Sequence, residues 1–135
     1  MACPFCNLEK EKVLFENPLA AAFLDHYPVA QGHTLIITKR HIADVEEATE
    51  EEITAVFRLI SRCRSYIQEK HPCQGFNIGI NAGEAAGQTV FHLHFHLIPR
   101  RKGDVPNPRG GVRKVIPNLA RYPLAEGEDG RDKIF

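Results

Sequence analysis

The stretch that decides the fold is FHLHFHLIPR, residues 91–100. Histidines occupy positions 92, 94 and 96, and Phe or Leu occupies positions 91, 93, 95 and 97. An alternation with a period of two is typical of a β-strand, whose successive side chains point to opposite faces. We therefore predict a strand over residues 89–98 that Pro99 stops. One face of it carries three imidazoles and the other face is apolar.

The element that covers this apolar face is predicted to be a long helix from Glu50 to about Lys70. Thr49 with Glu52 forms a capping box, and Pro72 follows the end of the helix. Apolar residues recur at helical spacing and form one stripe: Ile53, Val56, Phe57, Ile60, Cys63 and Ile67.

The remaining strands are short. Residues 13–15 and 20–24 flank an Asn-Pro turn and are predicted to form a hairpin, and residues 33–38 and 75–82 are predicted to be further strands. Together these elements predict an α+β domain in which an antiparallel sheet carries one long helix on its apolar face.

The composition is that of one ordinary globular domain. The chain has 135 residues, of which 43% are hydrophobic and 25% charged, and 17 basic residues balance 17 acidic ones. A balanced charge gives no electrostatic footprint for nucleic acid or for an anionic membrane. No apolar run approaches the roughly 20 residues of a membrane span, and the first residues lack the apolar centre of a secretion signal. We expect a cytoplasmic protein with no membrane or nucleic-acid partner, whose four cysteines are thiols or metal ligands.

Three interpretations of the histidine face are open. The rings could be solvated on an exposed strand, they could bind a catalytic metal, or one of them could be a nucleophile. A shared metal is disfavoured because strand positions two and four apart are separated by about 6.6 and 13 Å, whereas metal–nitrogen bonds are about 2.0–2.1 Å. A neutral imidazole with a pKa near 6.5 is a good nucleophile, and neighbouring rings can donate hydrogen bonds to a phosphate.

The sequence HLHFHLI, residues 92–98, resembles the His-φ-His-φ-His-φ-φ signature of the histidine-triad (HIT) superfamily of nucleotidyl hydrolases and transferases. Residues 87–104, GQTVFHLHFHLIPRRKGD, resemble the diadenosine-polyphosphate hydrolase branch, and residues 23–41, FLDHYPVAQGHTLIITKRH, resemble the nucleoside-binding segment of the family. The resemblance covers about residues 3–104. It implies a sheet of about five strands with one long and one short helix, in a HIT domain at 1–112. The polar and glycine-containing residues near the end of the chain predict a loosely held extension at 113–135.

The resemblance also implies roles for single residues. Catalytic roles fall to His94, His96 and Gln88, and nucleotide-binding roles fall to Asp25, His33, Asn81 and Thr89. His94 would attack the α-phosphorus while His96 hydrogen-bonds the α-phosphate. Gln88, Thr89 and Asn81 would lie near the phosphates, Asp25 would accept from a ribose hydroxyl, and His33 would orient the triad from behind.

A separate signal is the pair of cysteines in Cys3-Pro-Phe-Cys6. A CxxC pair suits zinc or redox chemistry, and the chain lacks the βαβ context of a thioredoxin-like motif. A closed zinc site needs two more ligands. The resemblance to zinc-containing HIT proteins supplies His41 and His92, which implies a structural zinc. The alternative is a pair of reduced thiols.

The function that we predict is hydrolysis of dinucleoside polyphosphates, such as diadenosine polyphosphates, through a nucleotidyl-histidine intermediate. Two alternatives are a nucleoside phosphoramidase and a nucleotide-binding module with little turnover. The resemblance implies a homodimer.

Overall fold

A computed structural model describes residues 3–119 and divides the chain into two compact units, Met1–Lys102 and Gly103–Phe135. In the second unit the described residues form two 3₁₀ turns, Gly111–Val115 and Pro117–Leu119. The domain boundary that the sequence predicts, at residue 112, thus lies inside the second unit. Most of the predicted tail, residues 120–135, lies outside the described residues.

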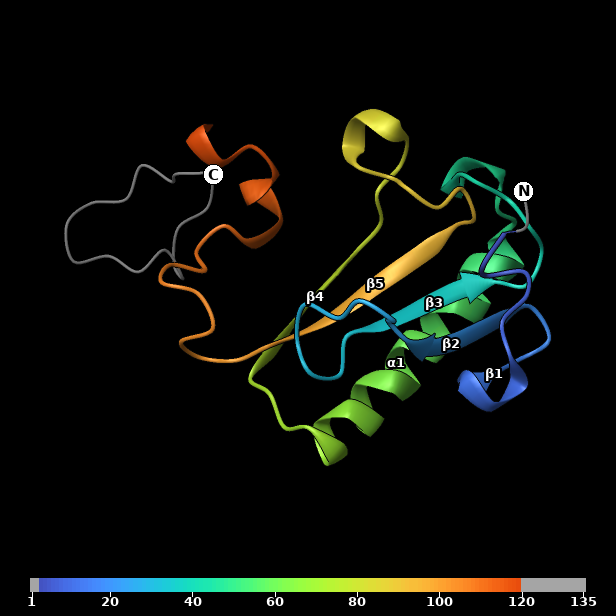
Figure 1. Ribbon diagram of the computed structural model, residues 1–135, viewed down its shortest axis with the longest axis horizontal. Helices are drawn as coiled ribbons and strands as arrows, with labels where there is room; N and C mark the ends of the chain where they lie inside the picture. Colours follow the sequence, from blue (N-terminus) through green and yellow to red (C-terminus); the bar gives the residue numbers. More distant parts are fainter. Residues whose placement is uncertain (1–2, 120–135) are drawn as a thin grey trace. The chain divides into compact units, whose positions relative to one another are not determined.

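The first unit is built on a five-stranded sheet, as predicted (Figure 1). Its strands are β1 (Val13–Glu16), β2 (Ala20–Leu24), β3 (Thr34–Thr38), β4 (Gly75–Gly79) and β5 (His94–Arg100). The spatial order is β1-β2-β3-β5-β4, and every pair is antiparallel. β5 is therefore an interior strand, between β3 and the edge strand β4.

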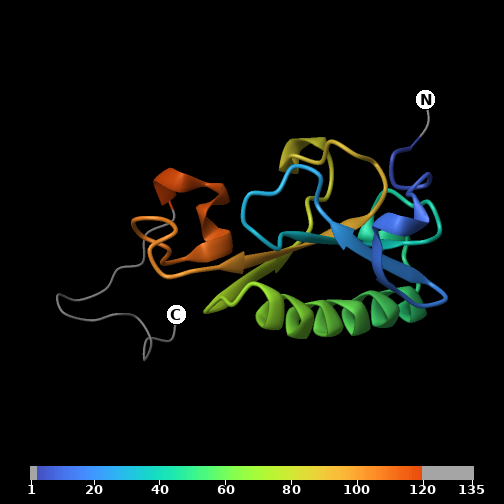
Figure 2. The ribbon, with the colours of Figure 1, turned by 60° about the horizontal axis from the view of Figure 1, so that its bottom comes forward.

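The long helix α1 (Glu50–Lys70) begins and ends where the sequence predicts, and the Thr49–Glu52 capping box is present. Figure 2 shows α1 along one face of the sheet. Its buried side chains, which include Val56 and Ile67, pack with apolar residues of β2, β3 and β5 into the main core. Phe57, which the sequence placed in the stripe, is 51% exposed. In the part of the chain that the structure describes, no helix has the length and apolarity to cross a membrane.

The histidine strand differs from its prediction at both ends. β5 begins at His94, so His92 lies before the strand, and Phe91 is half exposed. The strand continues through Pro99, because β3 begins at Thr34, opposite Leu97, and its pairing with β5 does not reach position 99. An amide N–H is therefore not needed there. The predicted alternation holds between these ends, where Phe95 and Leu97 are buried against the core.

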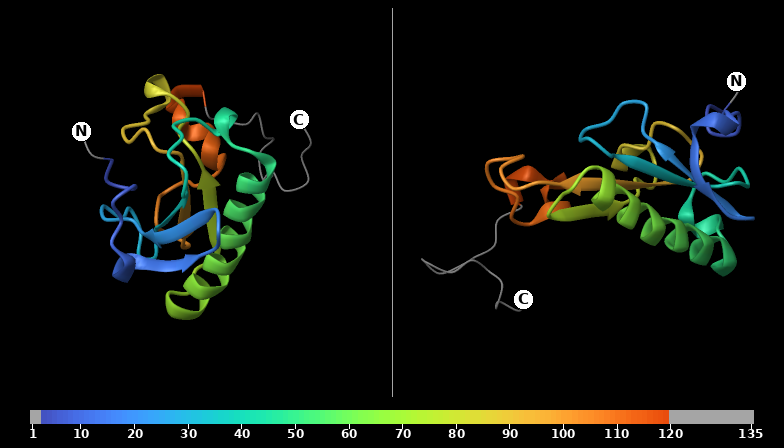
Figure 3. Two further views of the ribbon diagram at one scale, coloured as in Figure 1. Left: turned by 90° about the vertical axis from the view of Figure 1, so that its right-hand side faces the viewer. Right: turned by 90° about the horizontal axis from the view of Figure 1, so that it is seen from below.

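The sheet face opposite α1 carries the histidines. His96 lies opposite Leu35 and His94 opposite Ile37, so both rings share a face with these β3 side chains. A second apolar cluster of Ala21, Phe23, Leu35 and Ile37 lies on this face, and Phe5 and Leu8 of the N-terminal segment pack on it. Figure 3 shows that the N-terminal segment and α1 lie on opposite sides of the sheet.

Candidate active site and metal centre

A cavity of about 1030 Å³ opens on the histidine face of the sheet. Five of the predicted site residues line it: Asp25, Asn81, Thr89, His94 and His96. Its apolar walls include Phe5, Leu8, Phe23 and Leu35. The cavity therefore combines an apolar chamber with a polar end where two imidazoles and a carboxylate meet.

The His94 ring has a fixed tautomer. Its Nδ1 lies 2.7 Å from the backbone oxygen of His92. Because a carbonyl oxygen only accepts hydrogen bonds, Nδ1 must carry the proton and donate it. In the neutral ring Nε2 is then unprotonated, and its lone pair is available on a ring that lines the cavity. This is the state that a nucleophilic imidazole needs.

A hydrogen-bonded chain fixes the proton on His96 as well. The Val29 N–H donates to Nδ1 of the buried His33 at 3.1 Å, so the His33 proton is on Nε2. His33 Nε2 lies 3.0 Å from Nδ1 of His96 and 3.3 Å from Oδ2 of Asp25. His96 thus accepts at Nδ1 and carries its own proton on Nε2. It is a hydrogen-bond donor on the cavity wall.

Both of these histidines are held neutral. Burial lowers the pKa of His33, and the nearby Asp25 carboxylate offsets this only in part. The pKa of His96 is lowered first by burial and then by the neighbouring rings of His94 and His33. At neutral pH the chain therefore presents directed N–H groups and lone pairs instead of positive charges.

The hydrogen bonds among Asp25, His33 and His96 exclude a metal ion between these three side chains. Asp25, His33 and His96 have ligand atoms within 4.8 Å of one another. A metal would need the lone pair of His33 Nε2, but the Val29 N–H occupies Nδ1 and places the ring proton on Nε2. The group is consequently a hydrogen-bond relay.

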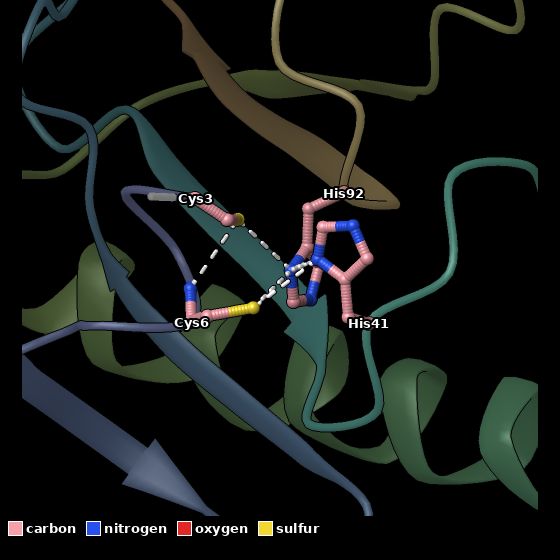
Figure 4. A group of neighbouring side chains, drawn as sticks. All are labelled: Cys3, Cys6, His41 and His92. Carbon is pink, nitrogen blue, oxygen red and sulfur yellow. Dashed lines mark hydrogen bonds between the residues drawn. The ribbon is translucent and has the colours of Figure 1, made fainter. Parts of the chain in front are cut away.

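The group formed by Cys3, Cys6, His41 and His92 does fit a metal (Figure 4). His92 Nδ1 lies 3.4 Å from Cys3 Sγ and 3.5 Å from Cys6 Sγ, and His41 Nδ1 lies 3.1 Å from Cys6 Sγ and 3.2 Å from His92 Nδ1. Tetrahedral zinc bound to two sulfurs and two nitrogens spaces its ligand atoms about 3.3–3.8 Å apart.

The protonation of His92 agrees with this interpretation. Its Nε2 lies 2.6 Å from the Thr38 carbonyl oxygen, to which it must donate, so Nδ1 offers its lone pair to the group. Burial lowers the pKa of His92 and keeps the ring neutral, as a metal ligand must be. Figure 4 shows the two sulfurs of the N-terminal segment directed at the His41 and His92 rings.

Comparison with known proteins identifies the family. The HIT domain model matches residues 8–103. The chain belongs to the HIT family. It is 37% identical over 93 residues to the bis(5'-nucleosyl)-tetraphosphatase (asymmetrical) of Schizosaccharomyces pombe, covering 69% of this chain and 51% of that one. It is 35% identical to the bis(5'-adenosyl)-triphosphatase of Dictyostelium discoideum, covering 74% and 67%. A crystal structure of a HIT family protein from Bacillus anthracis is similar with a TM-score of 0.70 and 38% identity, covering 76% and 75%.

Gln88 lies at the base of the loop before β5 in this HIT domain, and its amide is buried. Its Nε2 donates to the carbonyls of Ala43 and Val90 at 2.9 and 3.2 Å, and its Oε1 accepts from the Gly83 N–H at 2.9 Å. All of these partners are backbone groups. The amide therefore joins the segments before and after it instead of facing the cavity.

Two features of this HIT domain were missed by the sequence analysis. Phe5 lines the cavity, and its position between the two cysteines was the available signal. Glu52 was recognised only as a capping residue. It also binds Arg40 through Nε at 3.0 Å and Nη2 at 2.8 Å, which ties α1 to the segment that carries His41. No local sequence pattern predicts this contact.

Proposed function

We propose that this HIT protein cleaves dinucleoside polyphosphates at the α-phosphate through a covalent nucleotidyl group on His94. The observation that carries the proposal is the 2.7 Å hydrogen bond from His94 Nδ1 to the His92 carbonyl, which leaves Nε2 unprotonated in a nucleotide-sized cavity. The names of the two similar hydrolases from S. pombe and D. discoideum support the substrate class.

The chemistry would run in two displacements. The lone pair of His94 Nε2 attacks the α-phosphorus, a P–N bond forms, and the bond to the bridging oxygen breaks with its electrons leaving on the distal phosphate. Water then attacks the same phosphorus and loses a proton to solvent, while the P–N bond electrons return to Nε2. The products are a nucleoside monophosphate and the remaining nucleotide.

The other site residues would bind the nucleotide around the reacting atom. The Nε2–H of His96 would donate to a nonbridging α-oxygen whose negative charge grows in the transition state. Thr89 and Asn81 line the same cavity, and their hydroxyl and amide groups would contact the phosphates. Asp25 would accept from ribose hydroxyls, and the base would lie among Leu8, Phe23 and Leu35. Gln88 would act indirectly, by fixing the loop that carries Thr89.

We further propose that the Cys3, Cys6, His41 and His92 group holds one structural zinc ion. When bound, the ion would link the N-terminal segment to the sheet, and its four protein ligands would leave no open position for a reacting water. The chain would act as a homodimer in the cytoplasm. Among the strands that the structure describes, β4 pairs only with β5, and this edge position supports self-association.

The decisive experiment is to trap the intermediate. Diadenosine triphosphate or tetraphosphate is mixed with the enzyme and quenched within milliseconds, and peptides are analysed by mass spectrometry. The adenylyl mass is expected on the peptide containing His94, with AMP among the products. His94→Ala should bind nucleotide without turnover, and the matched control His71→Ala, which changes a histidine outside the cavity, should form the adduct. Adduct on another residue, or full turnover by His94→Ala, would refute the assignment. Turnover of adenosine phosphoramidate alone would favour the phosphoramidase alternative.

A further inference from the structure

The ring of Phe5 joins the metal group to the reactive histidine. Phe5 lies in the chain between the two cysteines of the group. Its ring is edge-on to that of His94, with centroids 5.1 Å apart and planes at 77°. It makes a similar contact with His92, at 6.0 Å and 70°. The segment between the sulfurs therefore reaches the histidine that we assign as the nucleophile.

The Phe5 ring is itself held in place. It contacts Phe23 at 5.4 Å and packs on the apolar cluster of β2 and β3. The Cys3 and Cys6 sulfurs on either side of it approach the histidine nitrogens of the group. The Phe5 ring is therefore held by the two flanking cysteines and by the close-packed apolar cluster on which it lies, so its movement is restricted.

His94 is thus constrained from two directions by one cluster. The backbone carbonyl of His92, a member of the metal group, accepts the Nδ1–H of His94 and sets its tautomer. Phe5, tethered by the cysteines of the same group, contacts the ring of His94 and opposes its rotation about the Cβ–Cγ bond. Edge-to-face aromatic contacts favour a defined angle between the two planes.

We propose that Phe5 is a positioning residue: the segment between Cys3 and Cys6 presses its ring against His94 and aligns Nε2 for attack on phosphorus. The inference rests on the proposed role of His94 as the nucleophile. It assigns the cysteine segment a part in catalysis beyond stabilising the fold. A small misalignment of a reacting group can lower a rate by about 100-fold.

The test combines kinetics with the state of the His94 ring. The variant Phe5→Leu keeps an apolar side chain but loses the aromatic ring. The variant Phe5→Tyr retains the ring and serves as the conservative replacement. Long-range ¹⁵N–¹H NMR spectra report the tautomer of each histidine. In Phe5→Leu we expect the Nε2-unprotonated form of His94 to mix with the other tautomer and kcat to fall roughly 10- to 100-fold. The KM should change less than threefold, and Phe5→Tyr should recover most of the kcat.

Leu8→Ala is the matched control. Leu8 lines the same cavity and packs on the same cluster, but it lies outside the cysteine segment. Its truncation should raise KM and leave the His94 NMR signals as in the wild type. If Phe5→Leu behaves in the same way, with a higher KM and an unchanged His94 tautomer, Phe5 is merely a cavity wall and the inference is wrong.

A double-mutant cycle tests the tether. Cys6→Ser should shift the His94 signals in the direction seen for Phe5→Leu, and the double variant should shift them little further, because both changes release the same ring. Independent, additive shifts would overturn the coupling. The spectra do not depend on turnover. A failure of the proposed function, seen as full activity in His94→Ala, is therefore distinguishable from a failure of this inference.

Discussion

Replacing Glu52 by Gln should destabilise the fold in a strongly pH-dependent way. The Glu52 side chain is 5% exposed, and its carboxylate accepts two hydrogen bonds from Arg40 and one from the Thr49 N–H at 2.9 Å. The hydrogen bond with Arg40, followed by that with the Thr49 backbone, lowers the pKa of Glu52 from 4.5 to about 2. Gln retains the shape and one acceptor oxygen, but it removes the charge.

The magnitude follows from this shift. Lowering the pKa of Glu52 by about 2.5 stabilises the folded state by roughly 3 kcal/mol, because one pKa unit corresponds to 1.36 kcal/mol. The Arg40 side chain is 52% exposed, and solvent screening reduces the expected value to about 2 kcal/mol. Because the folded-state pKa lies below the unfolded value, the contribution is complete above about pH 4.5 and disappears as the pH falls toward 2.

Urea unfolding at pH 7 and at pH 3 measures the effect. Glu52→Gln should lose about 2 kcal/mol at pH 7 and distinctly less at pH 3. Glu51→Gln is the matched control, since Glu51 is exposed in the same first helical turn and should cost less than about 0.5 kcal/mol. An equal loss for the two variants, or a loss for Glu52→Gln that does not depend on pH, would contradict the argument.

The other predictions concern the metal, the ribose, a buried thiol and the assembly. Metal analysis of protein purified without added metals should find one zinc per chain, and Cys6→Ser should lose it together with thermal stability; zinc-free wild type would refute the site. Asp25→Ala should weaken binding of AMP by about 10- to 100-fold, as expected for loss of a charge-assisted hydrogen bond, but should bind a 2',3'-dideoxy analogue nearly as the wild type does; equal losses for both ligands would make Asp25 structural. Burial raises the pKa of the Cys63 thiol to about 11, so this thiol should react with a disulfide reagent only after unfolding, and rapid labelling of the folded protein would show otherwise. Light scattering should give the mass of a dimer, and a monomer at micromolar concentration would refute the proposed self-association.

The sequence predicted those parts of the fold that depend on local interactions. The ends of helix α1 could be predicted from its capping box and from the spacing of its apolar residues, because both signals act within one or two helical turns. The start of β5 could not be predicted in this way. The alternating pattern continues back to Phe91, but the pairing of β5 with β3 stops at His94, opposite Ile37. The Leu93 N–H instead donates to the Ile42 carbonyl at 2.6 Å.

The site shows the same division. The spacing of His94 and His96 along one strand predicted their common face. The contacts of Gln88 and Phe5 depend on partners 45 and 89 positions away in sequence, the Ala43 carbonyl and the His94 ring. Contacts between residues so far apart in sequence produce no periodic pattern by which they could be predicted. A glutamine before a strand has the same local signature whether its amide faces a ligand or the protein interior.

The position of β5 between β3 and β4 has a consequence for how the molecule folds. The hairpin β1–β2 and its neighbour β3 are nearly consecutive, whereas the β3–β5 ladder joins Thr34 to Leu97 across the whole of α1. Loop-closure entropy opposes such a distant pairing, so it should be among the last to form. His33 and His96 meet only across this ladder. An intermediate that contains the hairpin and the helix would accordingly have most of the secondary structure and no relay between the histidines, and the ability to bind nucleotide should appear in a single late kinetic phase of refolding.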